Sequence, residues 1–124
     1  MPGTAYWAIT VAYDSGEYHF FEVLQRFRAP GETARQRLYE VACAHRHKAG
    51  LRERSRRVYR QGADAYYVRI EGRMSAHDLR FHLAELVWDS EKSPHPPAYS
   101  ALPSPTGSEP RDAGPDGPGA PPPQ

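Results

Sequence analysis

The five residues from Cys43 to His47, which read CAHRH, carry the side chains best suited to chemistry in this sequence. On a helix, Cys43 and His47 lie one turn apart with Glu40 one turn earlier, and thiolate, imidazole and carboxylate groups are all zinc ligands. Two ligands on one turn do not complete a site, and the cationic neighbours Arg46 and Lys48 oppose a bound cation. Basic residues near a helix C-terminus also complement the helix dipole. We therefore expect neither a metal nor a cofactor here.

Catalytic arrangements are equally incomplete. Cys43 with His47 as its base would form a nucleophile pair, but a cysteine in the interior of a helix is usually unreactive. A second titratable group comprises His77, Asp78, His82 and Glu85. On a helix, Asp78 and His82 would make a solvated contact one turn apart. The sequence lacks a phosphate-binding glycine loop, zinc-finger spacing and a glycine-flanked serine turn. We predict no catalytic residues and a protein that is not an enzyme.

The segment from 45 to 60 is the most basic part of the chain, with Glu53 as its only acidic residue. If its side chains meet in space, they form a patch for phosphates, with Tyr59 and Tyr67 available to stack on bases. The candidate nucleic-acid-binding residues are Arg46, Lys48, Arg52, Arg54, Arg56, Arg57, Tyr59 and Arg60. The alternative is a helix end followed by a solvated loop, whose charges keep a sheet edge from pairing.

The elements that position these residues begin with two strands, predicted over 6–13 and 17–27. The first alternates with a period of two, and the second is rich in aromatic and β-branched residues. Between them, a three-residue loop would place Gly16 last, where a left-handed backbone is required. Tyr13 would then oppose Glu17, and Trp7 would lie beside Val23. A loop of two residues would reverse the faces of the second strand.

In this register most of the large apolar side chains share one face, which carries Trp7, Ile9, Val11, His19, Phe21, Val23 and Phe27. The opposite face is not cleanly polar. Its aromatic and aliphatic residues predict a surface that binds a partner protein or a second copy of the chain. These partner-binding residues are Tyr6, Tyr18, Phe20 and Leu24. The alternative is that the C-terminal tail or a loop covers them.

Downstream of this hairpin the pattern predicts a helix, a second hairpin and a second helix. Thr33 and Gln36 have the form of a capping box for a helix to about Ala49, with Gly50 as its stop. One stripe of this helix at helical spacing consists of Ala34, Leu38, Val41, Ala42 and His45. The second hairpin pairs 57–61 with 65–71. Ser75 and Asp78 form another capping box, and the helix that follows to about residue 89 has a core stripe of Leu79, Leu83, Leu86 and Val87. The predicted fold is α+β, ββαββα, a four-stranded antiparallel sheet with two helices on one face.

Composition sets the remaining limits. The chain has 124 residues, a net charge of +1 and one cysteine, which fits a cytoplasmic protein with no disulfide of its own. No apolar run is long enough for a membrane span, and no secretion signal is expected. Residues 93–124 hold all but two of the 13 prolines, so we predict a single domain over 1–92 and a disordered tail over 93–124.

We therefore predict a small, non-enzymatic binding or regulatory module that acts through protein–protein contacts. The expected partner is another protein or a second copy of the chain. Nucleic-acid binding through the Arg-rich segment 45–60 is the alternative.

Overall fold

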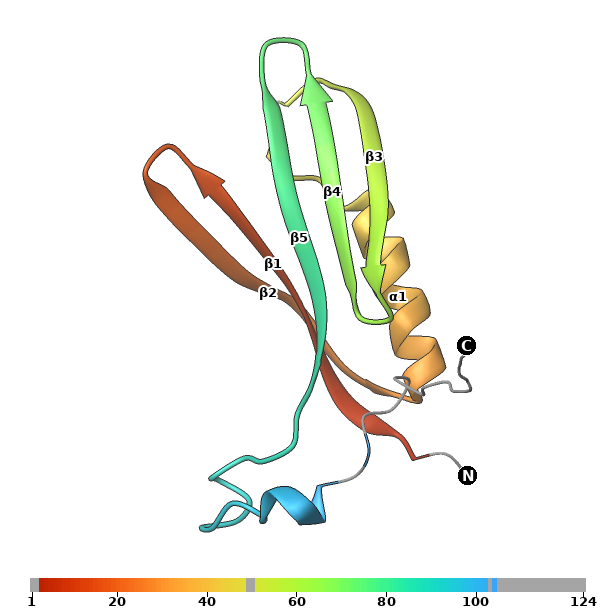
Figure 1. Ribbon diagram of the computed structural model, residues 1–124, viewed down its shortest axis with the longest axis vertical. Helices are drawn as coiled ribbons and strands as arrows, with labels where there is room; N and C mark the ends of the chain where they lie inside the picture. Colours follow the sequence, from red (N-terminus) through yellow and green to blue (C-terminus); the bar gives the residue numbers. More distant parts are fainter. Residues whose placement is uncertain (1–2, 49–50, 103, 105–124) are drawn as a thin grey trace, which may run out of the picture. The chain divides into compact units, whose positions relative to one another are not determined.

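A five-stranded antiparallel sheet with one helix packed on it makes up the first of the two units, residues 1–86 and 87–124, into which the chain divides. The structure is a computed structural model that describes residues 3–48, 51–102 and 104. The elements of the first unit are β1 (Ala5–Ser15), β2 (Tyr18–Ala29), α1 (Gly31–Ala44), β3 (Glu53–Gly62), β4 (Ala65–Gly72) and β5 (Ala76–Glu85). The strand order is β2-β1-β5-β4-β3, so the first and last strands lie side by side (Figure 1).

The α+β class is confirmed, but the prediction of four strands and two helices was wrong. The segment predicted as a second helix forms β5, in which Leu79, Phe81 and Leu83 are buried at every second position. A spacing of four residues fits one helical turn and also two repeats of a strand, so Leu79 and Leu83 could not distinguish the two. The pairing with β1 makes this segment a strand, because β5 supplies hydrogen-bonding partners to β1 from Trp7 to Tyr13.

The first hairpin forms, but its predicted register was wrong. Ser15 pairs with Tyr18, so the loop consists of two residues, and Gly16 holds a φ of +63° at its first position. Both two-residue hairpin turns and the expected three-residue loop need a glycine with positive φ, so Gly16 fits either one. Further along, Trp7 pairs with Phe27, and Leu24 is an extra residue in a β-bulge between the partners of Ile9 and Thr10.

The helix α1 begins directly after Pro30 and has no side-chain cap, so the capping box predicted at Thr33 does not form. The carbonyl of Pro30 accepts the first hydrogen bond, from the amide of Ala34 at 3.0 Å. The predicted apolar stripe is confirmed, because Ala34, Leu38 and Ala42 are fully buried. The helix ends at Ala44, earlier than predicted, while Ala49 and Gly50 lie outside the described residues.

The core lies between α1 and one face of the sheet. The small side chains of the helix stripe let α1 approach residues contributed by β1, β4 and β5. Those sheet residues are Trp7, Ile9, Val11, Tyr66, Val68, Ile70, Leu79, Phe81 and Leu83. Trp7 also donates a buried hydrogen bond from its Nε1 to the carbonyl of Ala29 at 2.8 Å. This bond fastens the end of β2 to β1 just before the chain turns into the helix.

The second hairpin, β3 with β4, is confirmed where the sequence predicts it. Arg56 on β3 ties this hairpin to the end of α1. Its guanidinium donates to the carbonyls of Ala42 at 2.9 Å and His45 at 2.6 Å, and it also binds the carboxylate of Glu53 at 2.9 Å. A cation at this position satisfies carbonyls that a helix end leaves without partners.

In the second unit, a short 3-10 helix spans Tyr99–Ala101. Trp88 donates from its indole Nε1 to the carbonyl of Ser93 at 3.1 Å. Residue 103 and residues 105–124, which make up most of the predicted tail, lie outside the described residues. Among the helices that the structure describes, none combines the length and apolar character that a membrane crossing requires.

We predict that Arg56→Ala lowers the free energy of unfolding by about 2–3 kcal/mol, because two helix-end carbonyls and Glu53 lose a charged donor. Arg56→Lys should recover only part of this loss, since an ammonium lacks the planar fork of donors. Urea denaturation at pH 7 measures both. The exposed Arg54 on the same strand provides the control: Arg54→Ala should change stability by no more than about 0.5 kcal/mol. Equal effects at the two positions would contradict this role.

Candidate functional site

In the described part of the chain, the side chains best suited to chemistry do not come together in a group that could hold a metal ion. Because α1 ends at Ala44, Cys43 and His47 do not share a helical turn. Both line a hollow of about 330 Å³ whose other walls are Ala44, Arg46, Lys48, Leu51, Glu53 and Arg56. Within residues 3–48, 51–102 and 104, no group of three or more His, Cys, Asp or Glu side chains is placed to hold a metal ion.

His47 packs between two rings instead. Its imidazole meets Tyr13 edge-on with ring centroids 4.6 Å apart, and it lies 4.9 Å from the ring of His77. Burial lowers the pKa of His47 to about 4, and the charges of His77, Lys48, His45 and Arg56 act in the same direction. Burial also lowers the pKa values of His77 and His45. At neutral pH these histidines therefore act as uncharged packing groups.

The second titratable group also changes character, because it lies on a strand. Asp78 accepts a hydrogen bond from the hydroxyl of Tyr67 at 2.6 Å and forms an ion pair with Arg69 at 3.0 Å. The hydrogen bond from Tyr67, together with Arg69, lowers the pKa of Asp78. Arg69 also reaches Glu71 at 3.5 Å. This network joins β4 to β5 on the face of the sheet that α1 does not cover.

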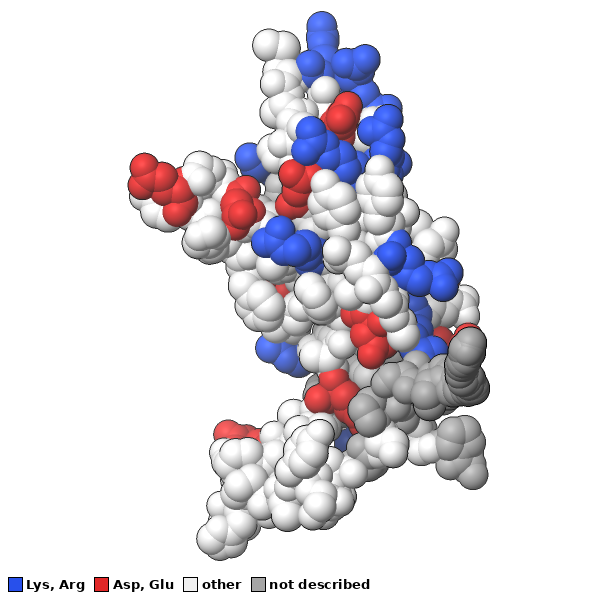
Figure 2. Space-filling view, viewed as in Figure 1, with Lys and Arg blue, Asp and Glu red and all other residues white. Residues whose placement is uncertain are grey.

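The Arg-rich segment does not form one patch. In β3, Arg56 and Arg60 pair with the core residues Ile70 and Tyr66, so they lie on the helix side of the sheet. Arg57 and Tyr59 pair with Arg69 and Tyr67 and lie on the opposite side. Arg46 and Lys48 belong to the loop after α1. Arg52 directly precedes β3, and Arg54 lies at its start. Lys and Arg gather near the β4–β5 turn in Figure 2, but acidic residues intervene further down.

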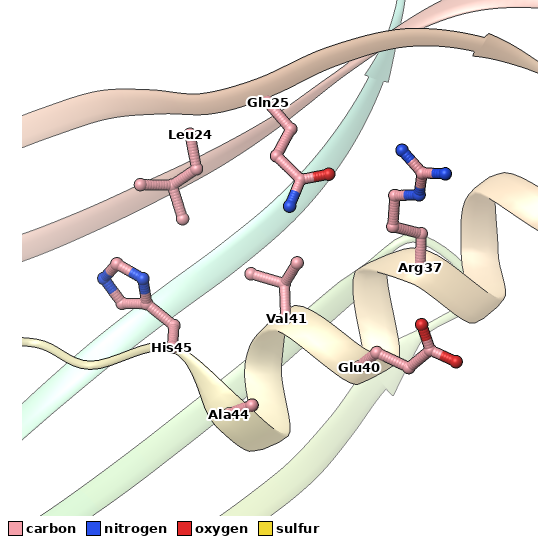
Figure 3. A pocket seen from close by; sticks show the side chains of 7 residues that line it. All are labelled: Leu24, Gln25, Arg37, Glu40, Val41, Ala44 and His45. Atoms are coloured by element: carbon pink, nitrogen blue, oxygen red, sulfur yellow. The ribbon is translucent and has the colours of Figure 1, made fainter.

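The predicted partner-binding face is also divided between two sides of the sheet. Tyr6 pairs with Arg28 on the side away from α1, and the guanidinium of Arg28 lies 5.5 Å from its ring centroid. Tyr18 and Phe20 lie on the helix side, where Phe20 stacks on Tyr13 at 5.1 Å. Tyr18 is 71% exposed and Phe20 43% exposed, so the hairpin presents apolar surface to solvent. The half-buried Leu24 points toward the helix from the bulge (Figure 3).

Leu24 lines a groove of about 620 Å³ between β2 and α1, which is called here the β2–α1 groove. Its lining residues are Leu24, Gln25, Arg37, Glu40, Val41, Ala44 and His45. Figure 3 shows Leu24 and Gln25 reaching down from β2, with Val41 and His45 rising from the helix toward them. Arg37 stands at one end, with its guanidinium 4.4 Å from the ring centroid of Phe27. The groove therefore has an apolar floor and polar groups on its rim.

The two edge strands of the sheet differ sharply in composition. β3 has the sequence ERSRRVYRQG, and its four arginines are the kind of charge that keeps a free edge from pairing. β2 has the sequence YHFFEVLQRFRA, which contains fewer arginines and more aromatic residues than β3 does. In Figure 1 the tip of the β1–β2 hairpin diverges from β5, and β2 is paired with β1 on one side and with no described strand on the other. Of the two edge strands, β2 therefore carries the smaller number of arginines.

Sequence reasoning found Val41 and His45 on the inward helix stripe but missed Gln25 and Arg37 as groove residues. The sequence could not reveal Gln25, because the bulge at Leu24 changes which β2 residues face the helix.

Comparisons of the chain with models of protein families, with curated proteins and with solved structures found no match.

The half-buried histidines predict a loss of stability in acid. An imidazole with a pKa of about 4 when folded and 6.5 when unfolded binds protons preferentially in the unfolded chain. The part of the stability that depends on His47 should therefore fall as the pH drops from about 6.5 to 4 and change no further below that. His47→Phe, which keeps a ring, should show a smaller drop in melting temperature between pH 7 and pH 5. His19→Gln, at a mostly exposed histidine, should keep the full drop. An unchanged drop in His47→Phe would contradict the assignment.

Proposed function

We propose that this protein is a small non-enzymatic binding module that holds an extended segment of a partner protein against the free edge of β2. The observation that carries the proposal is the β2–α1 groove, which runs beside an edge strand with fewer arginines and more aromatic residues than β3. A segment that adds to an exposed edge gains main-chain hydrogen bonds along its length. Side chains at alternate positions then enter the neighbouring groove, where they determine which partner is preferred.

The lining of the groove indicates what such a side chain should be. Leu24, Val41 and Ala44 offer contact to one medium-sized apolar side chain. Glu40 at the rim accepts a hydrogen bond from Gln36 at 3.1 Å, while Arg37 stacks on Phe27. Both rim charges remain at the surface, so an apolar residue flanked by polar ones suits the groove better than a continuous apolar run.

The exposed aromatic residues at the hairpin tip add contact area to the same edge. Tyr18 and Phe20 lie on the helix side of the sheet, as the groove does. Aromatic side chains with large exposed areas gain most from burial in an interface. A partner segment that runs along β2 would cover these two rings and the groove together. In contrast to the predicted single face, Tyr6 lies on the other side and has no part in this site.

Photo-crosslinking in the native cell tests the proposal. A photoreactive phenylalanine analogue at Gln25, in the groove, should give a discrete adduct with another protein. The same analogue at Met74, which is 92% exposed next to the β4–β5 turn, should not. Placing a carboxylate in the groove with Val41→Glu should reduce the Gln25 adduct at least about tenfold, because its desolvation costs more than about 1.4 kcal/mol.

Two outcomes would contradict the proposal. One is the absence of any protein adduct at Gln25, and the other is an adduct that Val41→Glu leaves unchanged in a folded protein. An adduct of twice the chain mass would identify a second copy as the partner. The circular-dichroism melt of Val41→Glu establishes that the variant is folded.

A further inference from the structure

The face of the sheet opposite α1, called here the open face, carries aromatic and arginine side chains on an uncovered surface. Within residues 3–86 that the structure describes, the only helix packs on the other side. Strand pairing sets one row of the open face across all five strands. That row consists of Phe21 on β2, Ala12 on β1, Arg80 on β5, Tyr67 on β4 and Tyr59 on β3.

The two ends of this row expose aromatic rings. Phe21 is 68% exposed and Tyr59 is 48% exposed. Tyr59 stacks on Tyr67 with ring centroids 5.4 Å apart and an angle of 17° between the rings. The hydrogen bond from the hydroxyl of Tyr67 to Asp78 holds this pair in place and raises the pKa of Tyr67. The open face thus presents ring surfaces that need no rearrangement before a flat group stacks on them.

Small side chains separate the aromatic ends. Ala12 lies beside Phe21, and Ala8 and Ala84 are paired across β1 and β5 in the row four residues further along these strands. Thr10 and Ala65 border the intervening row around His82. Such a floor is shallow, which leaves room for a planar ring to approach the backbone between the aromatic ends. Adjacent strands are about 4.8 Å apart, so the row from β2 to β3 spans about 19 Å.

The charges of the open face favour an anion. The carboxylates of Asp78 and Glu71 are engaged by Arg69, and Arg57 also reaches Glu71 at 3.8 Å. Arg69 and Arg57 therefore neutralise Asp78 and Glu71, and Asp14 near the hairpin tip contacts His19. The guanidinium groups of Arg80, in the row, and of Arg26, beside Ala8 further along β2, have no such carboxylate partner among the described residues.

We propose that the open face binds short stretches of single-stranded nucleic acid. Bases stack on Phe21 and on the Tyr59–Tyr67 pair, and phosphates meet Arg80 and Arg26. A duplex is excluded from this mode because its bases are already stacked on one another. The span of the row suits a segment of about four nucleotides, the lower end of the range for single-strand sites. This site uses a different face from the β2–α1 groove and does not depend on it.

Fluorescence anisotropy with labelled 12-nucleotide oligo(U) and oligo(dU), and with a 12-base-pair duplex, tests the proposal on the full chain. Both single strands should bind saturably and the duplex much more weakly. Affinity should fall steeply between about 50 mM and 200 mM salt, since phosphate contacts release counterions. Tighter binding of oligo(U) than of oligo(dU), which differs from it only in the sugar, would point to RNA through contacts to the 2′-hydroxyl, and the reverse order would point to DNA.

Matched variants separate this face from the rest of the protein. Phe21→Ala and Tyr59→Ala should each weaken binding about fivefold or more, whereas Tyr59→Phe, which keeps the ring, should bind as the wild type does. Arg80→Gln should weaken binding and reduce the salt slope by about one. The controls are Tyr18→Ala and Arg37→Gln, an exposed aromatic residue and an arginine on the helix side, and neither should change affinity.

Three results would overturn the proposal. They are the absence of saturable binding at low salt, equal affinity for duplex and single strands, and equal losses in the control variants. Loss of binding in Tyr59→Phe would overturn the stacking role of that ring. Melting temperatures of all variants ensure that only folded proteins are compared. None of these results affects the crosslink at Gln25, so the two proposed sites succeed or fail separately.

Discussion

The pairing of β1 with β5 is the constraint on which the rest of this structure depends. It runs antiparallel from Trp7 opposite Glu85 to Tyr13 opposite Leu79, and it joins the N-terminal hairpin to the three-stranded meander β3-β4-β5. Without it, each part would be a small sheet with too little buried surface to be stable. Once it forms, one continuous sheet presents a single apolar face to α1. It also forces β2 and β3 to the two edges, so the composition of those strands decides how the protein meets other molecules.

The arginines of this chain have several different structural roles. Arg56 is a structural group that binds the carbonyls at the end of α1, and Arg69 holds Asp78 within the sheet. Other arginines on β3 charge an edge that would otherwise attract further strands. A guanidinium already engaged by carbonyls or carboxylates is not available to a phosphate. For this reason the number of basic residues between 45 and 60 overstated the charge available to a nucleic acid, and the site proposed on the open face relies on Arg80 and Arg26 instead.

The sheet separates two kinds of surface. On the helix side, the β2–α1 groove and the exposed rings of Tyr18 and Phe20 suit an extended polypeptide that continues the sheet. On the open face, rings and guanidinium groups lie flat across the strands, a surface suited to planar bases and phosphates. Because side chains of one strand alternate between faces, a strand such as β2 contributes to both surfaces with different residues. Occupation of one surface therefore need not exclude occupation of the other.

The sequence alone determined the local features: the α+β class, the two hairpins and the apolar stripe of α1. These follow from periodicity, turn residues and side-chain chemistry, which act over a few residues. It did not determine the identity of β5, because the spacing of Leu79 and Leu83 fits a helix and a strand equally well. It also did not determine the register of β2, because Gly16 fits two loops and a bulge at Leu24 has no sequence signal of its own. The tertiary structure decided both, since only the long-range pairing of β1 with its two neighbours fixes which side chains share a face.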